Sequence, residues 1–468
     1  MTATSIATQQ AVDTRDPVAR IDAFLDAAGP TVMRHDDGGA GVVTARGRVQ
    51  GVDVAVFATD PRMQGGALGA AGCAAIADLY AEAVAAGEAV VGIWHSGGAR
   101  LADGAASLDG VGRVFAAMTR ASGVVPQVSI VLGPAAGGAA YGPALTDVVV
   151  LGPAGRIFVT GPDVVRSVTG EDVDMARLGG PEPHGRRSGV AHVVTQTDAE
   201  ALEVGADTVA MLGAPGRVNA TSGGAVAHLM PDSARRAYDV RPIVASLLDD
   251  GPRVELHPRW AASVCTTLGR LGGGTVGVIA NNPLHVGGCL DATSAEKTAR
   301  FVRMCDAFGV PIVVLVDVPG YLPGVAQEWD GVVRRGAKLL HAFAESTVPR
   351  VTVITRKAYG GAYIAMNSRS LGATHVFAWP DAELAVMGAT AAVRLIHRRK
   401  LAEVPEQQRG DVEAELVAEH ERSAGGVSRG VELGLVDDVI APDDTRASVS
   451  RVLSECVVQR GRHRNIPL

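Results

Sequence analysis

The chain lacks several features that mark common protein classes. Its five cysteines are an odd number and include no Cys-x-x-Cys pair, so the sequence predicts reduced thiols and no zinc ribbon or other metal centre. No apolar run follows a basic start near the first methionine, which argues against a secretory signal. The net charge of −7 argues against nucleic acid or an anionic membrane as the main ligand. We therefore expect a cytoplasmic protein.

The composition is that of a folded chain longer than one ordinary domain. Hydrophobic residues make up 47% and charged residues 20% of the 468 residues, which excludes a disordered protein. Residues 123–146 carry no charge over a length that could cross a bilayer. However, Pro126, Pro134 and Pro143 would leave main-chain groups unsatisfied in lipid. We expect a buried strand, turn and helix there instead.

The sequence repeats itself at a spacing of 223 residues. At this offset Val125-Pro126-Gln127-Val128 aligns with Val348-Pro349-Arg350-Val351, and Gly137-Gly138-Ala139 aligns with Gly360-Gly361-Ala362. Gly97 falls on Gly320 in the same frame. The identities are few, but their constant order indicates a duplicated domain rather than a solenoid.

In the second half, β-branched runs alternate with segments of helical periodicity. Strands are predicted at residues 275–280, 311–318 and 351–355, and helices at residues 295–308, 335–345 and 411–424. This alternation predicts mostly parallel sheets with crossover helices. We expect two α/β domains, residues 1–225 and 226–468, divided within a stretch rich in glycine and proline.

Three glycine pairs stand where predicted strands end. They lie in Ser96-Gly97-Gly98-Ala99-Arg100, Ala136-Gly137-Gly138-Ala139 and Tyr359-Gly360-Gly361-Ala362-Tyr363. A glycine pair that opens a helix lets main-chain N–H groups approach a ligand, and the helix dipole favours negative charge there. The Walker A pattern is absent, so an oxyanion hole fits better than a phosphate loop. Tight packing of helix on strand is the alternative for any single pair.

These and further segments resemble the β subunits of biotin-dependent acyl-CoA carboxylases. The further segments are Gly133-Pro134-Ala135-Ala136, Val316-Asp317-Val318-Pro319-Gly320-Tyr321-Leu322-Pro323-Gly324, Ala378-Trp379-Pro380, Val386-Met387-Gly388 and Arg462-His463-Arg464-Asn465-Ile466-Pro467-Leu468. The resemblance spans nearly the whole chain. It is closest to the short form that supplies malonyl-CoA or methylmalonyl-CoA to actinobacterial-type lipid or polyketide synthesis. It implies two tandem crotonase-like domains, the first holding acyl-CoA and the second carboxybiotin.

The resemblance also implies roles for individual residues. Gly137 and Gly138 would stabilise the thioester enolate, and Gly361 and Ala362 the urea oxygen of biotin. Because the repeat aligns Gly361-Ala362 with Gly138-Ala139, the first pair is alternatively one residue later. Acyl-CoA contacts are expected from Ser96, Gly97, Gly98, Ala99, Arg100, Ala139 and Ile364, and biotin contacts from Pro319, Gly320, Tyr321 and Gly360.

The implied chemistry needs no side-chain nucleophile or base. Carboxybiotin releases CO2, the remaining biotin anion takes the α-proton of the thioester, and the enolate attacks CO2, so each anion needs N–H donors in a dry site. Accordingly, no Ser/His/Asp set or carboxylate pair stands out.

Several titratable side chains have a plain alternative to a functional role. His95 fits a structural role better than a catalytic one. Two roles are comparably compatible with Arg100: a contact to a CoA phosphate, and a packing or ion-pair contact within the protein. Tyr321 either lines the biotin pocket or fills core volume, and the basic run at residues 397–400 favours a solvated helix face.

Ile364 follows the second glycine pair directly. By resemblance, this position influences the choice of acyl chain, and members that prefer propionyl-CoA often carry aspartate there. Isoleucine predicts that acetyl-CoA is accepted as well as propionyl-CoA.

The chain has no lysine suited to carry biotin, which is usually attached within Met-Lys-Met. Its four lysines are Lys297, Lys338, Lys357 and Lys400, and none has a methionine neighbour. An ATP-binding glycine-rich loop is also missing. A separate biotinylated, ATP-using α subunit is therefore expected. By resemblance the chain itself forms a homo-oligomer, expected to be a hexamer with the active site at a dimer interface.

Other functions compete with this one. A biotin-dependent decarboxylase subunit would use the same two holes in reverse, and a non-catalytic assembly subunit would keep the fold alone. An enoyl-CoA hydratase would need one domain and a carboxylate pair, so the duplication disfavours it.

Overall fold

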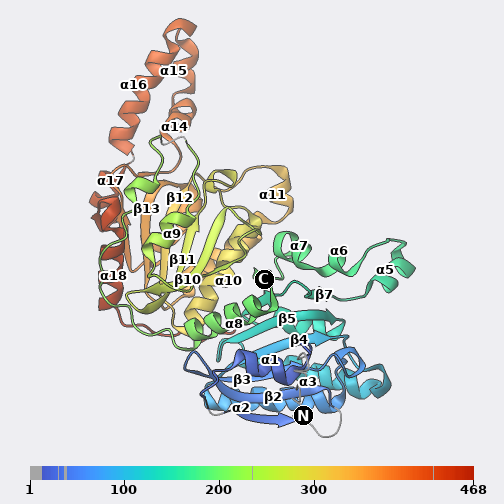
Figure 1. The fold of residues 1–468 in the computed structure, drawn as a ribbon. Helices are drawn as coiled ribbons and strands as arrows, with labels where there is room; N and C mark the ends of the chain where they lie inside the picture. Colours follow the sequence, from blue (N-terminus) through green and yellow to red (C-terminus); the bar gives the residue numbers. More distant parts are fainter. Residues whose placement is uncertain (1–12, 30, 36–39, 234–235, 425, 468) are drawn as a thin grey trace, which may run out of the picture. The chain divides into compact units, whose positions relative to one another are not determined.

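The computed structural model describes residues 13–29, 31–35, 40–233, 236–424 and 426–467. The chain forms two compact units, Met1–Gly213 and Ala214–Leu468, each built around a sheet (Figure 1). The second unit starts at Ala214, before the boundary expected after residue 225. The residues that follow Ala214 form hydrogen bonds with other residues of the second unit. The Asn219 N–H donates to the Gly272 carbonyl over 3.1 Å, and the Thr221 N–H donates to the Ser450 hydroxyl over 3.0 Å.

The first unit contains a mixed sheet in the order β1-β2-β3-β4-β5-β6-β8. β1 to β3 pair antiparallel, β3 to β8 pair parallel, and β7 pairs with the end of β5. The strands are β1 (Val32–His35), β2 (Val42–Val49), β3 (Val52–Thr59), β4 (Ala89–Ser96), β5 (Gln127–Ala136), β6 (Val148–Leu151), β7 (Arg156–Phe158) and β8 (Val193–Val194). The helices are α1 (Pro17–Phe24), α2 (Ala70–Ala86), α3 (Ala105–Ala121), α4 (Gly138–Leu145), α5 (Pro162–Thr169), α6 (Met175–Gly179), α7 (Pro181–Pro183) and α8 (Asp198–Gly213).

The second unit repeats this sheet in the order β9-β10-β11-β12-β13-β14-β16, with β15 paired to the end of β13. The strands are β9 (Val254–Leu256), β10 (Val264–Leu271), β11 (Gly274–Asn281), β12 (Ile312–Val318), β13 (Arg350–Tyr359), β14 (His375–Ala378), β15 (Glu383–Ala385) and β16 (Asp438–Val439). The helices are α9 (Arg241–Leu247), α10 (Ala292–Phe308), α11 (Val325–Trp329), α12 (Val332–Glu345), α13 (Gly360–Ala365), α14 (Ala389–Ile396), α15 (Arg398–Glu403), α16 (Glu406–Ala424), α17 (Val427–Glu432) and α18 (Thr445–Glu455). The predicted strands and helices of this half are confirmed.

The duplication extends to single hydrogen bonds. The Leu68 N–H donates to the Gly98 carbonyl over 2.7 Å, and the Leu290 N–H donates to the Gly320 carbonyl over 3.1 Å. Isolated bridges join Leu68 to Ala99 and Leu290 to Tyr321. The main-chain counterpart of Gly320 is therefore Gly98, one residue later than the expected Gly97.

Alternate residues of β11 face two different helix layers. Val276 and Val278 belong to the cluster of buried side chains that contains residues of α9 and α18. A Cβ on Gly277 would instead lie 2.6 Å from the Cys305 sulfur and 2.9 Å from the Phe301 ring, both in α10. The sheet is thus covered on both faces, which is why its strands read as continuous apolar runs.

The uncharged stretch at residues 123–146 forms β5 and α4, as predicted. Nowhere in the described part of the chain does a helix combine the length and apolarity of a bilayer span. All five cysteines are free. Helices α14 to α16 have a small core of their own, made by Val393, Leu401 and Leu416.

Candidate active site

A helix-opening glycine turn ends an inner strand of each sheet, β5 in the first unit and β13 in the second. In the first unit β5 ends at Ala136, Gly137 has a φ of +57°, and α4 starts at Gly138. In the second unit β13 ends at Tyr359, and Gly360 has the same φ of +57°. Only glycine enters this region of φ without steric cost. The shared φ and the shared place after the strand make Gly137 and Gly360 equivalent residues of one repeated turn.

The amides that the first turn can offer to a ligand are those of Gly138 and Ala139. The Gly137 N–H already donates to the Phe158 carbonyl over 3.1 Å. The first N–H groups of a helix have no acceptor within the helix, which leaves the next two amides for another partner. The main chain therefore disfavours the expected pair Gly137–Gly138 and favours the alternative pair Gly138–Ala139.

Gly361 and Ala362 hold the equivalent places in the second turn, but their surroundings differ. A Cβ on Gly138 would lie 3.0 Å from Cγ1 of Val111, so close packing is one reason for glycine there. A Cβ on Gly361 would meet no heavy atom within 4 Å. Neither packing nor backbone conformation requires glycine at Gly361, and the open space in front of it can receive a ligand atom.

A cavity of about 450 Å³ lies beside the second turn. Its lining includes three residues predicted for the site, Gly360, Gly361 and Ile364, and Ile364 is 48% exposed. Much of the remaining wall is apolar and comes from Leu384, Ala385, Val386, Leu433 and Leu435. Sequence reasoning missed most of this wall, because residues 433–435 lie far from the glycine motif along the chain.

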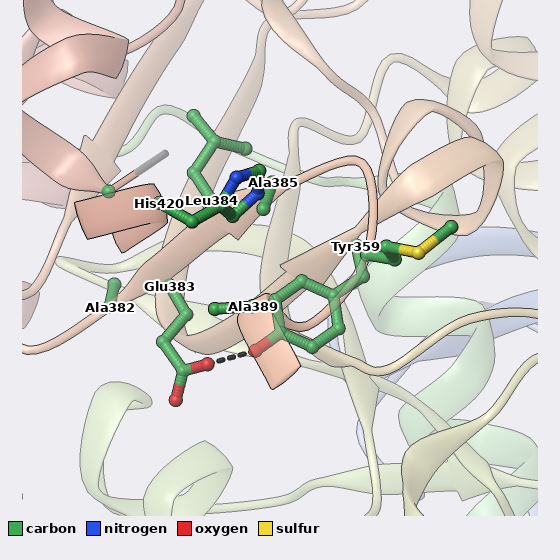
Figure 2. A pocket seen from close by; sticks show the side chains of 9 residues that line it. Tyr359, Ala382, Glu383, Leu384, Ala385, Ala389 and His420 are labelled. Carbon is green, nitrogen blue, oxygen red and sulfur yellow. Dashed lines mark hydrogen bonds between the residues drawn. The ribbon is translucent and has the colours of Figure 1, made fainter. Parts of the chain in front are cut away.

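A smaller cavity of about 200 Å³ adjoins it and is lined in part by the same residues, Leu384, Ala385 and Gly426. Figure 2 shows the Tyr359 ring reaching toward Glu383, to which its hydroxyl donates a hydrogen bond. Since Tyr359 directly precedes Gly360, this bond fixes the strand end that leads into the second turn.

The other expected ligand segments also lie close to strand ends. A Cβ on Gly98 would lie 2.8 Å from the Ala136 carbonyl, which places the 96–100 segment against the first turn. In the second unit, the Tyr321 hydroxyl lies 3.0 Å from the position of a Cβ on Gly336 of α12. Burial raises the pKa of Tyr321 to about 12, so this phenol stays neutral near pH 7.

The end of β12, before Pro319, is tied to β13 by a buried ion pair. Nε of Arg356 lies 2.9 Å from Oδ2 of Asp317, and these side chains are 10% and 2% exposed. The Tyr238 hydroxyl donates to the same carboxylate over 3.1 Å, and its ring lies beneath the guanidinium at 5.0 Å. Sequence reasoning gave Asp317 no role, since a lone aspartate in an apolar strand carries no motif.

The family model described as "Carboxyl transferase domain" matches residues 19–463. The chain belongs to this family. It is 58% identical over 464 residues to the "Biotin-dependent acetyl-/propionyl-coenzyme A carboxylase beta6 subunit" of Mycobacterium tuberculosis, covering 98% of both chains. It is 53% identical to the "Propionyl-CoA carboxylase beta chain" of Rhodococcus erythropolis, again covering 98% of both.

Among solved structures, transcarboxylase 12S with bound methylmalonyl-coenzyme A superposes with a TM-score of 0.88 at 36% identity. The match covers 97% of this chain and 92% of the transcarboxylase, which assembles as a hexamer. The expected enzyme class, an acyl-CoA carboxyltransferase, and the expected pair of crotonase-like domains are confirmed.

His95 of this carboxyltransferase is packed rather than poised for proton transfer. Its ring lies 2.4 Å from the position that a Cβ on Gly133 would take, and the main-chain N–H of His95 donates to the Thr59 hydroxyl over 2.8 Å. Burial, aided by the charge of Arg20, lowers the pKa of His95 to about 4. The imidazole is therefore neutral near pH 7.

Arg100 of the carboxyltransferase is engaged by main-chain carbonyls. Its Nη2 donates to the Ala40 carbonyl over 3.2 Å and to the Ala67 carbonyl over 3.4 Å. These contacts tie the 96–100 segment to its own unit. The basic run at residues 397–400 spans the start of α15, and Arg398, Arg399 and Lys400 are exposed there. In the described ranges, no group of three or more His, Cys, Asp or Glu is arranged to hold a metal ion.

Proposed function

We propose that this carboxyltransferase moves a carboxyl group from carboxybiotin on a partner subunit to the α carbon of acetyl-CoA or propionyl-CoA. The products are malonyl-CoA or methylmalonyl-CoA. The observation that supports this most directly is the second turn, where Gly361 faces open space although packing does not call for glycine. A glycine kept for access is what a main-chain oxyanion site requires.

In the first turn, the N–H groups of Gly138 and Ala139 stabilise the oxygen of the thioester as it becomes an enolate. Donors of this kind are fixed before the reaction, so they do not have to reorient as charge develops. The acyl-CoA side of the site includes Ser96, Gly97, Gly98 and Ala99, which lie against the strand end at Ala136. Arg100 supports this segment through its carbonyl contacts instead of binding a CoA phosphate.

The second turn fits biotin, because it combines two helix-opening amides with a largely apolar cavity of about 450 Å³. When bound, biotin supplies the carboxyl group and then a base for the α-proton. The N–H groups of Gly361 and Ala362 hold the ureido oxygen. Gly360 shapes the turn, while Pro319, Gly320 and Tyr321 border the site.

The biotin arrives on a separate α subunit that also uses ATP. Lys297 is 2% exposed and could not carry a mobile prosthetic group. The remaining three lysines lack the methionine neighbours of a biotinylated lysine. The likeness to transcarboxylase 12S, which forms a hexamer, supports a hexamer for this chain, and we place the active site at a dimer interface within it.

The acyl preference is set in part by Ile364, which is 48% exposed and lines the cavity beside the second turn. An uncharged, branched side chain there accepts both acetyl and propionyl groups. Relatives named for acetyl-/propionyl-coenzyme A and for propionyl-CoA support this range.

The test is a reconstituted reaction with the purified chain, its biotinylated α subunit, ATP, labelled bicarbonate and either acetyl-CoA or propionyl-CoA. We expect labelled malonyl-CoA and methylmalonyl-CoA only when both subunits are present, and avidin should block both products. If no biotinylated partner of the same organism supports product formation, the chain is an assembly subunit and the proposal is wrong.

A further inference from the structure

Lys297 lies near the start of α10 and is one of the most deeply buried side chains of the second unit. It is 2% exposed, and its ammonium is held by main-chain oxygens alone. Nζ lies 2.6 Å from the Val264 carbonyl, 2.9 Å from that of His257, 3.2 Å from that of Trp260 and 3.4 Å from that of Ala261. Among the described residues, no carboxylate lies within ion-pair distance of it.

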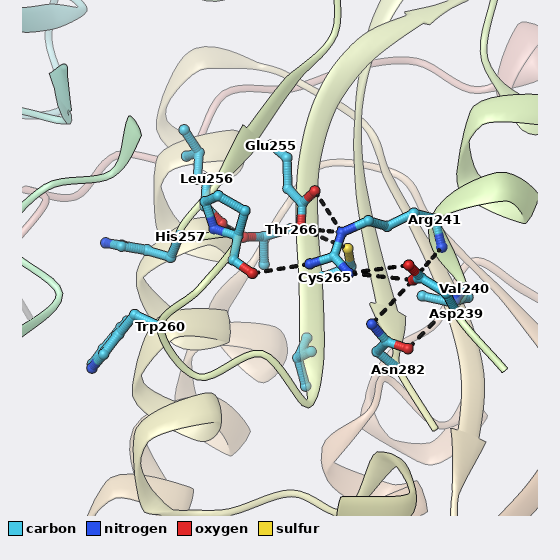
Figure 3. Close-up of polar contacts among 12 residues, drawn as sticks. Asp239, Val240, Arg241, Glu255, Leu256, His257, Trp260, Cys265, Thr266 and Asn282 are labelled. Atoms are coloured by element: carbon cyan, nitrogen blue, oxygen red, sulfur yellow. Dashed lines mark hydrogen bonds and ion pairs between the residues drawn. The ribbon is translucent and has the colours of Figure 1, made fainter. Parts of the chain in front are cut away.

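The carboxylate of Glu255, which lies near Lys297, is paired with Arg241 instead. Glu255 accepts from Nε of Arg241 at 2.8 and 3.0 Å, and Arg241 also reaches Asp239 (Figure 3). Figure 3 shows Glu255, Arg241 and Asp239 joined in one network, and the rings of His257 and Trp260 pointing away from it. The charge of Lys297 is therefore compensated by carbonyl dipoles, as it is for an ion that has exchanged its water shell for carbonyl oxygens.

The loop that supplies these oxygens has an unusual backbone. His257 has a φ of +54° and Ala261 a φ of +49°, a region that residues other than glycine rarely adopt. Both carbonyls belong to the set around Nζ. Such conformations persist only where the surroundings compensate for their cost, and the shared cation provides that compensation.

The two aromatic rings of this loop are buried, while Arg259 between them is exposed. His257 and Trp260 are 3% and 7% exposed, and their ring centroids lie 4.9 Å apart. The Ala261 carbonyl also accepts from the Val264 N–H over 3.3 Å. Without a cation, the four carbonyls would lose the charged donor that they share, which is costly for buried oxygens. The equivalent position in α2 of the first unit is Ala75, so the first unit has no such lysine.

We propose that the loop between His257 and Val264 is a carbonyl cage for a monovalent cation, and that the Lys297 ammonium occupies it as a tethered ion. A cage of this kind accepts potassium or free ammonium once the lysine side chain is removed. Its task is to hold the connection between β9 and β10 against α10, independently of the proposed function.

The test compares two substitutions of the full chain by thermal unfolding in chloride salts of equal concentration. Lys297→Ala vacates the cage, whereas Lys297→Met puts an apolar side chain of similar length in the place of the lysine and supplies no charge. In choline chloride we expect each to lower the melting temperature by roughly 10 °C, the scale of several lost charge-assisted hydrogen bonds in a chain of this size. The matched control is Lys338→Ala, because Lys338 is a partly exposed lysine paired with Glu296, and it should change little.

Potassium or ammonium chloride should then raise the melting temperature of Lys297→Ala in a concentration-dependent manner. It should not help Lys297→Met or the control. Equal behaviour of Lys297→Ala in potassium, ammonium and choline salts would overturn the proposal, as would a fully stable Lys297→Met. If Lys297→Ala folds only in potassium or ammonium salts, the refolding yield is the readout and supports the cage. Failure in every salt counts against it.

A second measurement needs no variant. The chain has only four lysines, so mass spectrometry after brief treatment with an amine-acylating reagent reports on each one. Lys338 and Lys400 should react in the folded protein, and Lys297 should react only after unfolding. Acylation of Lys297 at the rate of Lys338 in the folded protein would exclude a closed cage.

Discussion

The two halves of the molecule build the same glycine turn and surround it differently. Gly138 of the first turn has Val111 at contact distance, while Gly361 of the second turn faces open space. Before each turn, the neighbouring strand carries His95 in the first half and the ion-paired Asp317 at the equivalent place in the second. Duplication thus preserved the main-chain turn, while the side chains around it diverged.

The strongest test of this contrast is Gly361→Val. Because the added side chain enters open space, we expect an unchanged melting temperature but a loss of about 100- to 1,000-fold in kcat, the effect of removing one oxyanion donor. The assay is carboxylation with the α subunit, beside a thermal scan. The matched change Gly138→Val should lower both activity and stability, since Val111 must move. A fully active Gly361→Val would refute the assignment of the Gly361 and Ala362 amides as an oxyanion site.

The next test is Asp317→Asn, which leaves Arg356 without its buried counterion. We expect a loss of about 3 kcal/mol in the free energy of unfolding, measured with urea. The comparison in the first half is Ser129→Ala, which removes only the hydrogen bond from the Trp94 indole and should cost about 1 kcal/mol. Equal effects of the two changes would contradict the view that the second half relies on this ion pair.

A smaller effect is expected from Ile364→Asp at the edge of the cavity. The kcat/KM ratio of acetyl-CoA to propionyl-CoA should fall by roughly tenfold, within the range that small changes of an acyl pocket produce. Tyr141 is the equivalent residue of the first half and is likewise half exposed. Tyr141→Phe should leave the ratio unchanged. If the kcat/KM ratio is unaltered in Ile364→Asp, Ile364 has no part in the choice of acyl chain.

The smallest effect on activity concerns His95, a partly buried imidazole whose counterpart in the second half is Asp317. Its pKa is about 4 in the fold against 6.5 in the unfolded chain. The unfolded state therefore binds more protons between these values, and stability should decrease as the pH falls from about 6.5 to about 4. His95→Asn should show a shallower decrease by urea unfolding across this range and should keep measurable activity. An unchanged slope would mean that His95 is already protonated in the fold.

The sequence by itself determined the repeat, the α/β class and the two helix-opening glycine pairs. These features are local, because β-branched runs, helical periodicity and glycine at a positive φ act through neighbouring residues. The same local information identified the missing biotinyl lysine. It also predicted Gly361 and Ile364, both of which line the cavity beside the second turn.

Only the tertiary structure decided which amides are available and what surrounds them. The Gly137 N–H is taken by Phe158, a residue of the neighbouring strand β7, and no local pattern reveals that bond. Likewise, the apolar wall at Leu433 and Leu435 and the cage around Lys297 gather groups far apart in the chain. Such sites depend on how strands pair and helices pack, so residue order alone does not specify them.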